Sequence, residues 1–215
     1  DIQGAIDASN KLLLLVSLDE SKGHAKYQQR ARIIIANGLF DLKQYQQAEM
    51  AISELLKTAD LNKKQQLLFK RRRSESLYQL AEEAKLANNF SVAIDLFLQV
   101  KDYQPTSDIA IKAHFDAAVL LLQTESWDKS AQLFDSFRNS YPKNQLTPSI
   151  AERLALIYEK QQDWNKAAEE YKTLAKNFFS KLLNEDNGDE LLNKAKIDAL
   201  QRLQRGEIDT LPEDP

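Results

Sequence analysis

The chain has 215 residues, with 32 acidic and 29 basic side chains and a formal net charge of −3. This balance argues against a general nucleic-acid binder, because such proteins are usually strongly basic. The absence of cysteine excludes disulfides, thiolate metal sites and cysteine nucleophiles, and two histidines leave little for a histidine-based metal site. We therefore expect no catalytic residue, no cofactor and no metal in this sequence.

No apolar run approaches the roughly 20 residues that span a bilayer, since the runs at 11–18 and 33–40 are far shorter. No signal peptide is visible. Because the sequence begins with Asp rather than Met, we interpret it as an excised or processed segment. A signal or an anchor could therefore precede it.

Helical periodicity runs along the chain, and no alternation of period two predicts a strand. Residues 2–13 predict the second helix of a unit whose first helix would precede residue 1. Residues 24–41 and 45–58 predict the first complete helix pair, and 61–80 predict a longer first helix in the next unit. The predicted organisation is a half-unit, four complete units, a C-terminal capping helix and an acidic disordered tail, at 1–22, 23–60, 61–107, 108–144, 145–180, 190–206 and 207–215.

A spacing pattern recurs four times in these units. An aromatic residue is followed three positions later by a small residue and four positions after that by an apolar or aromatic one. The four anchoring aromatics, spaced 45, 37 and 37 residues apart, are Tyr45, Phe90, Trp127 and Trp164. An alanine stands nine residues before each anchor, at Ala36, Ala81, Ala118 and Ala155. The repetition indicates an array of equivalent structural units.

The pattern predicts two antiparallel helices per unit. The small residues let the helices approach closely, and the aromatic fills the turn between them. Pro105 and Pro142 stand fifteen residues after the two middle anchors, where they would close the second helix. A single unit cannot bury its apolar face, so stacked units share a core. Phe97, Phe134 and Tyr171 are therefore predicted core residues.

In its spacing, small residues, turn aromatics and closing prolines, the region from about 24 to 179 resembles the tetratricopeptide repeat (TPR) family. The resemblance implies an all-α fold, an α-α superhelix or solenoid of stacked TPR-like helical hairpins. It also implies a non-catalytic scaffold that presents a concave groove to a peptide, a helix or a partner subunit.

A finer resemblance concerns residues 134–178. They are similar to the 37-residue repeats of bacterial cell-envelope proteins, such as the outer-membrane assembly lipoprotein BamD and the periplasmic TPR protein of the Tol–Pal system. Tyr141, Pro142 and Pro148 match the family's features, whereas Asp60 replaces the closing proline of the first unit. This implies a periplasmic or outer-membrane-associated protein, and a cytoplasmic location is the alternative.

In a TPR-like stack the first helices line the concave side, and residues next to the core alanines at helical spacing face the groove. The predicted partner-binding residues of the second, third and fourth units are Tyr78, Glu82, Lys85, Phe115, Val119, Leu122, Glu152, Leu156 and Glu159. The first unit would contribute Ile33, Asn37 and Phe40. The middle of this surface is apolar and its C-terminal part is acidic, which favours a protein or peptide with apolar anchors. Alternatively, another helix of this chain, such as 191–206, covers it.

Two charged runs in the sequence are weaker candidates for binding sites. The basic run KRRR (70–73) could contact a phosphate or an acidic partner, but pairing with nearby acids such as Glu75, Glu82 and Glu83 is favoured. The sequence NEDNGDE (184–190) fails the ligand spacing of a calcium loop. Two further functional hypotheses remain open: a self-associating structural segment, and a regulatory TPR region of a larger enzyme whose catalytic domain lies elsewhere.

Overall fold

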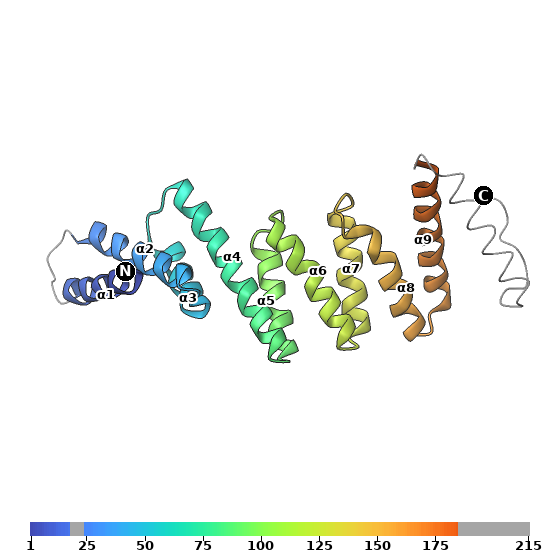
Figure 1. The fold of residues 1–215 in the computed structure, drawn as a ribbon, viewed down its shortest axis with the longest axis horizontal. Helices are drawn as coiled ribbons and strands as arrows, with labels where there is room; N and C mark the ends of the chain where they lie inside the picture. The colour runs from blue at the N-terminus through green and yellow to red at the C-terminus, as the bar shows by residue number, and fades with distance from the viewer. Residues whose placement is uncertain (18–23, 185–215) are drawn as a thin grey trace, which may run out of the picture. The chain divides into compact units, whose positions relative to one another are not determined.

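The computed structural model describes residues 1–17 and 24–184 (Figure 1). The capping helix predicted at 190–206 and the tail predicted at 207–215 lie outside the described residues. The helices fall into two compact units, 1–142 and 143–215, which are described separately below.

The described residues form α-helices joined by short connections, with one 3-10 turn and no strand. In chain order the elements are α1 (Ile2–Ser17), α2 (Ala25–Asp41), α3 (Tyr45–Thr58), α4 (Lys63–Leu86), α5 (Phe90–Tyr103), α6 (Asp108–Gln123), α7 (Trp127–Ser140), η1 (Thr147–Ser149), α8 (Ile150–Lys160) and α9 (Trp164–Asn184). Within the first unit each helix from α1 to α7 packs chiefly on the next along the chain. The predicted all-α fold of stacked TPR-like helical hairpins is confirmed.

Local signals set the helix ends. The long helix α4 begins at a capping box, in which the Gln65 backbone N–H donates to the Asn62 side chain (2.9 Å) and the Asn62 N–H donates to the Gln65 side chain (3.1 Å). With 24 residues α4 is the longest described helix, as the sequence predicts for the first helix of that unit. The helices α5 and α7 each end two residues before a proline, at Pro105 and Pro142.

The four tight turns inside the hairpins share one geometry. Each contains a residue in the left-handed region with φ between 57° and 59°, namely Lys43, Asn88, Glu125 and Gln162. In the α6–α7 turn, Ser126 N–H donates to Leu121 O (2.9 Å) and Glu125 N–H donates to Leu122 O (3.1 Å). This pair of bonds is the Schellman motif, which satisfies the last carbonyls of a helix. The same pair recurs in the other three turns.

Small residues bring neighbouring helices together in the first unit. Ala81 of α4, Ala93 of α5 and Ala117 of α6 are fully buried around Phe97 in one apolar cluster. Phe134 of α7 is also fully buried, so both aromatic residues occupy the predicted core. Burying a phenylalanine in this way contributes about 1.5–3 kcal/mol relative to leaving it exposed.

The half-unit at the N-terminus also packs closely. Gly38 of α2 is buried, and a β-carbon at this position would come within 2.8 Å of the Ile6 side chain of α1. Glycine therefore permits the contact between α1 and α2.

Two arginines of the basic run join α4 to the hairpin before it. Arg72 Nη1 lies 3.2 Å from Asp41 Oδ1, and Arg73 Nε donates to Glu49 Oε1 (2.8 Å). The guanidinium of Arg73 also lies 4.5 Å from the ring centroid of Tyr103. Both arginines are mostly buried, so these two residues of the run make structural contacts, whereas Lys70 and Arg71 are exposed.

The predicted acidic partners of that run are only partly correct. Arg71 pairs with Glu75 one turn along α4 (3.3 Å), as expected. Pairing with Glu82 is wrong, because Glu82 accepts hydrogen bonds from Lys85 on its own helix. Arg72 and Arg73 instead contact acids of the neighbouring helices α2 and α3, and these partners could not be identified from the sequence close to the run.

The second unit corrects two expectations. Tyr171 of α9, a predicted core residue, is 47% exposed, and Trp164, which was predicted to fill the turn before α9, is 63% exposed. The physical reason is that no helix follows α9 among the described residues, so its far side is open. In addition, the fourth unit was predicted to end at 180, but its second helix α9 continues to Asn184.

Candidate functional site

The predicted binding residues of α4 meet α6 on one surface of the first unit, which we call the α4–α6 face. Its residues are Tyr78, Glu82, Lys85, Lys112, Asp116, Val119 and Leu122. The two helices are in direct contact, although α5 lies between them in sequence. Two of these residues, Lys112 and Asp116, were not predicted.

The centre of the α4–α6 face is a bond between its two helices. The Tyr78 hydroxyl donates to Asp116 Oδ2, and the Tyr78 ring packs on Phe97 with centroids 5.3 Å apart. Lys112 Nζ lies 4.8 Å from the centroid of the Tyr78 ring. Burial and the hydrogen bond to Asp116 raise the pKa of Tyr78, so the phenol stays protonated and serves as donor.

The carboxyl group of Asp116 is half-buried. Burial raises the pKa of Asp116, while the Tyr78 hydroxyl and the charge of Lys112 oppose that change. The Oδ2 atom is occupied by Tyr78, but Oδ1 has no hydrogen-bond partner among the described residues and is not fully buried. A donor that arrived from outside the chain would therefore find an oriented, half-buried acceptor.

Glu82 and Lys85 form an ion pair on α4. Lys85 Nζ donates to both carboxylate oxygens of Glu82, at 2.7 and 2.8 Å, across one turn of α4. Lys85 also lies 5.9 Å from the ring centroid of Phe97. The two opposite charges compensate each other, so this part of the face has no strong net sign.

The apolar part of the α4–α6 face lies along α6. Val119 and Leu122 are half-buried, one and two turns beyond Asp116. Phe115, in contrast, is 7% exposed and contacts Phe134 and Phe137 edge-on, with centroids 5.7 and 5.4 Å apart. Phe115 therefore belongs to the α6–α7 core and is not on the face.

The remaining predicted residues have different surroundings. Glu152 and Leu156 are exposed on α8 of the second unit, and Glu159 accepts a hydrogen bond from the Tyr171 hydroxyl (2.9 Å). In the first hairpin, Arg72 Nη1 donates to the Asn37 side chain (3.1 Å). The same guanidinium lies 4.7 Å from the Phe40 ring centroid, and Ile33 is half-buried. Arg72 thus occupies the surface that Asn37 and Phe40 would offer.

One sequence signal for Asp116 was available. Apart from Asp108 in the first turn, Asp116 is the one acidic residue in the largely apolar helix IAIKAHFDAAVLLL. A carboxylate within an apolar helix normally has a partner. The partner itself, Tyr78, is 38 residues away and could be identified only from the packing of α4 on α6.

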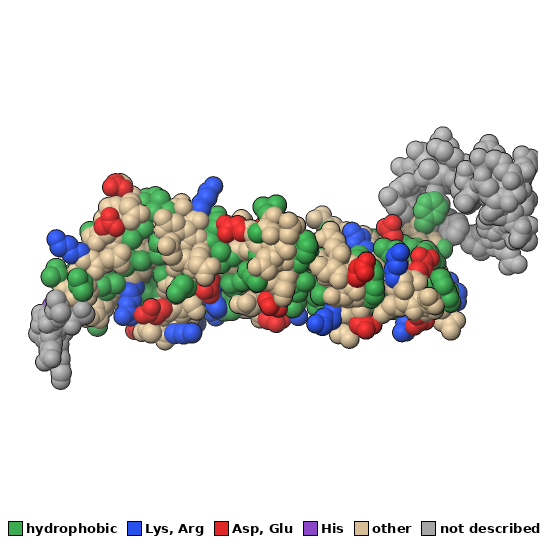
Figure 2. Space-filling model, turned by 90° about the horizontal axis from the view of Figure 1, so that it is seen from below, with side chains coloured by type: hydrophobic (Ala, Val, Ile, Leu, Met, Phe, Trp, Pro, Cys, Tyr) green, Lys and Arg blue, Asp and Glu red, His purple; other side chains and the backbone are tan. Residues whose placement is uncertain are grey.

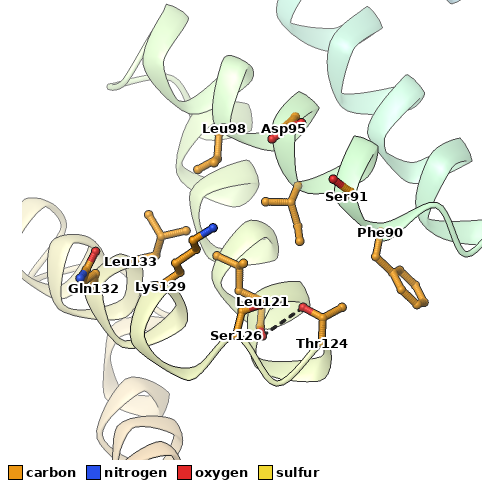
Figure 3. Close-up of a pocket in the computed structure, with 11 residues that line it drawn as sticks. Phe90, Ser91, Asp95, Leu98, Leu121, Thr124, Ser126, Lys129, Gln132 and Leu133 are labelled. Atoms are coloured by element: carbon orange, nitrogen blue, oxygen red, sulfur yellow. Dashed lines mark hydrogen bonds between the residues drawn. The ribbon is translucent and has the colours of Figure 1, made fainter.

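A second candidate is a hollow of about 560 Å³ between α5 and α7 (Figure 3). Ser91, Asp95 and Leu98 line it from α5, and Lys129 extends toward it from α7. Six of its eleven lining residues are polar or charged, but the hollow is widely open, whereas small-molecule sites are enclosed. The hollow therefore has less of the character of a binding site than the α4–α6 face.

The surface of the described residues is mixed in character. Figure 2 shows apolar side chains interspersed with both signs of charge on one face. Among the described residues there is no group of three or more His, Asp or Glu side chains that could hold a metal ion. None of the described helices is long and apolar enough to cross a membrane.

Comparisons with known proteins add a distant likeness. No family model and no curated protein matches the chain. Solved structures that are similar include BtubC from P. vanneervenii, at 11% identity over 100% of this chain and 92% of that chain, with a TM-score of 0.45. The apo form of RapI is 13% identical over 96% of this chain and 61% of that chain, also with a TM-score of 0.45. TPR-like repeats of a kinesin light chain from Podosopora anserina are 13% identical over 81% of this chain and 86% of that chain, with a TM-score of 0.41.

Proposed function

We propose that this chain is a non-catalytic protein-interaction scaffold, and that its α4–α6 face binds a peptide or helix of a partner protein. The observation that carries the proposal is Asp116, a half-buried carboxylate that Tyr78 orients and whose Oδ1 is open to a donor. Preorganised acceptors of this kind bind a ligand without first losing the entropy of ordering a side chain.

The surroundings define the chemistry of the partner. A lysine or arginine of the partner would satisfy Asp116 Oδ1, and its apolar side chains would cover Val119 and Leu122. An amphipathic helix presents such groups at positions spaced by three or four residues. We therefore infer a partner segment with one basic residue and apolar residues about one turn away.

The test uses peptides selected from a random display library on the immobilised full chain. Their affinity is then measured by fluorescence anisotropy against Asp116→Asn and Leu122→Asp. The control is Gln99→Asp, which places the same added charge on an exposed position of α5. Loss of a charge-assisted hydrogen bond costs about 1.5–3 kcal/mol, so we expect Asp116→Asn to weaken binding roughly tenfold or more.

Two outcomes would contradict the proposal. If all three variants bound the peptides as tightly as the wild-type chain, the binding site would lie elsewhere. A loss of affinity in the control Gln99→Asp would indicate a general charge effect. Circular dichroism verifies that helicity is kept. The matching change Leu156→Asp tests whether α8 of the second unit contributes to binding, as the sequence predicts.

A bacterial cell-envelope assembly remains our proposed setting. It is supported by the resemblance at Tyr141, Pro142 and Pro148, and the absence of cysteine is compatible with both an oxidising compartment and the cytosol. Fractionation of cells that express the natural full-length protein tests it. Recovery in the cytosolic fraction would contradict this setting without affecting the scaffold proposal.

Self-association is the second candidate function. Leu12 and Leu15 of α1 are 37% and 57% exposed, and Tyr27 of α2 is 54% exposed. Open arrays need polar ends to remain monomeric, so an apolar terminal helix favours association. Light scattering over a range of concentrations would show a dimer, and a strict monomer at high concentration would exclude this function for residues 1–215.

A further inference from the structure

The hollow between α5 and α7 is built mainly from different helices than the α4–α6 face. Its walls are the second helices of two successive hairpins, whereas the face lies on the first helices α4 and α6. The hollow has a volume of about 560 Å³, within the range of about 300–1,000 Å³ that ligand pockets show. It is too open to enclose a small molecule, but it has room for side chains of a partner protein.

The floor of the hollow is apolar. It is formed by Ile94 and Leu98 of α5, Leu121 of α6 and Leu133 of α7 (Figure 3). All of these except Leu121 are half-buried, so they pack on the core below and still contact solvent. A partner that covered them would remove further apolar surface from water, which favours binding.

The repeat shows that two of these apolar residues are not needed for the hairpin fold. Ile94 and Leu98 stand four and eight residues after the anchoring aromatic of their unit. At the same positions the other units have small, polar or charged residues, namely Glu49, Ser53, Ala131, Asp135, Ala168 and Lys172. Large apolar side chains at both positions therefore distinguish α5 from the other second helices.

Unpaired charges of opposite sign line the two walls of the hollow. Asp95 of α5 and Lys129 of α7 are both exposed, and neither forms a hydrogen bond or an ion pair with any described residue. Figure 3 shows Lys129 extending from α7 toward the hollow, with Asp95 on the other wall. A partner with a basic group toward α5 and an acidic group toward α7 would pair both charges, and this complementarity sets its orientation.

We propose that the α5–α7 hollow is a second docking surface of this chain, which takes an amphipathic helix of a partner protein. Its lining residues on α5 run from Phe90 to Leu98, about 12 Å or two helical turns, so it accommodates two large apolar side chains from successive turns of the partner. A helix fits better than an extended peptide, because the backbone groups of α5 and α7 bond within their own helices and offer no edge to pair with.

The charges complete the description of this partner. Its helix carries a basic residue on the flank that faces Asp95 and an acidic residue on the flank that faces Lys129, with the apolar pair between them. The surface is separate from the α4–α6 face, so the chain would hold two partner segments on different sets of helices.

The test selects helical peptides from a random display library on the full chain carrying Asp116→Asn and Leu122→Asp, which disable the α4–α6 face. Fluorescence anisotropy then compares this parent with versions that add Leu98→Asp or, as the control, Gln99→Asp. Gln99 is exposed on α5 outside the hollow. Because Leu98→Asp would bury a carboxylate under the bound helix, we expect it to weaken binding about tenfold or more, and Gln99→Asp less than about twofold.

Charge reversal tests the orientation of the bound helix. Asp95→Lys and Lys129→Glu change exposed side chains, so they leave the fold intact. Each should weaken binding about threefold or more, and reversing the matching charge of the peptide should restore the affinity. If circular dichroism shows that Leu98→Asp has lost helicity, this series decides alone.

The proposal is overturned if no enriched peptide distinguishes Leu98→Asp from Gln99→Asp while both remain helical. It is also overturned if the reversals in the chain and in the peptide act independently of each other. Neither result bears on the α4–α6 face, because that face is disabled in every variant of this series.

Discussion

His114 of α6 makes the stability of the first unit depend on pH. It is 2% exposed, its Nε2–H donates to Leu133 O (3.0 Å), and its Nδ1 has no partner among the described residues. Rings of Phe137 and Tyr141 lie 5.3 and 5.8 Å away. Burial and the nearby charge of Lys101 lower the pKa of His114 to about 4, from an ordinary value of 6.5.

The sign of the effect follows from proton linkage. Because the pKa is lower in the folded state, the unfolded chain binds more protons between pH 6.5 and 4. Stability is therefore complete above pH 6.5 and falls as the pH approaches 4. The difference of about 2.5 pKa units corresponds to a loss of about 3 kcal/mol, with about 2 kcal/mol already lost at pH 5.

The measurement is urea unfolding at several pH values, in wild type and in His114→Gln, with Trp164→Phe in both. Trp127 at the start of α7 then reports on the hairpin that contains His114. Glutamine keeps a donor but does not titrate, so the variant should lose less stability on acidification by about 2 kcal/mol at pH 5. Equal pH dependence in the two proteins would refute the reasoning, as would an NMR titration of His114 near 6.5.

Three further predictions concern the turns, the arginine contact and the helix spacing. Glu125→Gly should raise the free energy of unfolding by about 1 kcal/mol, because glycine adopts positive φ without strain; an unchanged urea midpoint would contradict this. Arg73→Gln should cost about 1–3 kcal/mol by leaving Glu49 buried without its partner, and a thermal melt that matches wild type would show the pair to be dispensable. Ser130 donates to Ala118 O (2.8 Å), where the other repeats have alanine. Ser130→Ala should therefore cost less than about 1 kcal/mol and Ser130→Leu about 1–3 kcal/mol from overpacking, and equal unfolding midpoints for the two variants would exclude close packing there.

The helix pairs could be predicted from sequence because close packing constrains residue size at fixed spacing. Ala81, Ala93 and Phe97 are identifiable without coordinates for this reason. Burial was harder to predict, because it depends on the next element as well as on the pattern. Phe134 and Tyr171 occupy the same repeat position, yet one is buried and the other is exposed.

The candidate site was predicted only in part. The predicted stripe through Tyr78 and Val119 stays a prediction as a binding surface. The structure adds Asp116 to it, because Tyr78 donates a hydrogen bond to this carboxylate across the two helices. The positive φ angles in the turns could not be predicted from the sequence either. Lys43, Glu125 and Gln162 have side chains with little preference for positive φ, and only the hydrogen bonds of the hairpin hold them there.

The common turn geometry implies that the array can change its length. The left-handed residues Asn88, Glu125 and Gln162 are 37 positions apart, so any stretch of 37 residues cut at equivalent turn positions contains one complete period. Duplicating 89–125 would place a new helix pair between identical junctions without shifting the register of either neighbour. Deleting the same stretch would join α4 directly to α7 through an equivalent turn. Because the turns have the same backbone geometry, a 37-residue period could be duplicated or lost between two of them, which would lengthen or shorten the protein.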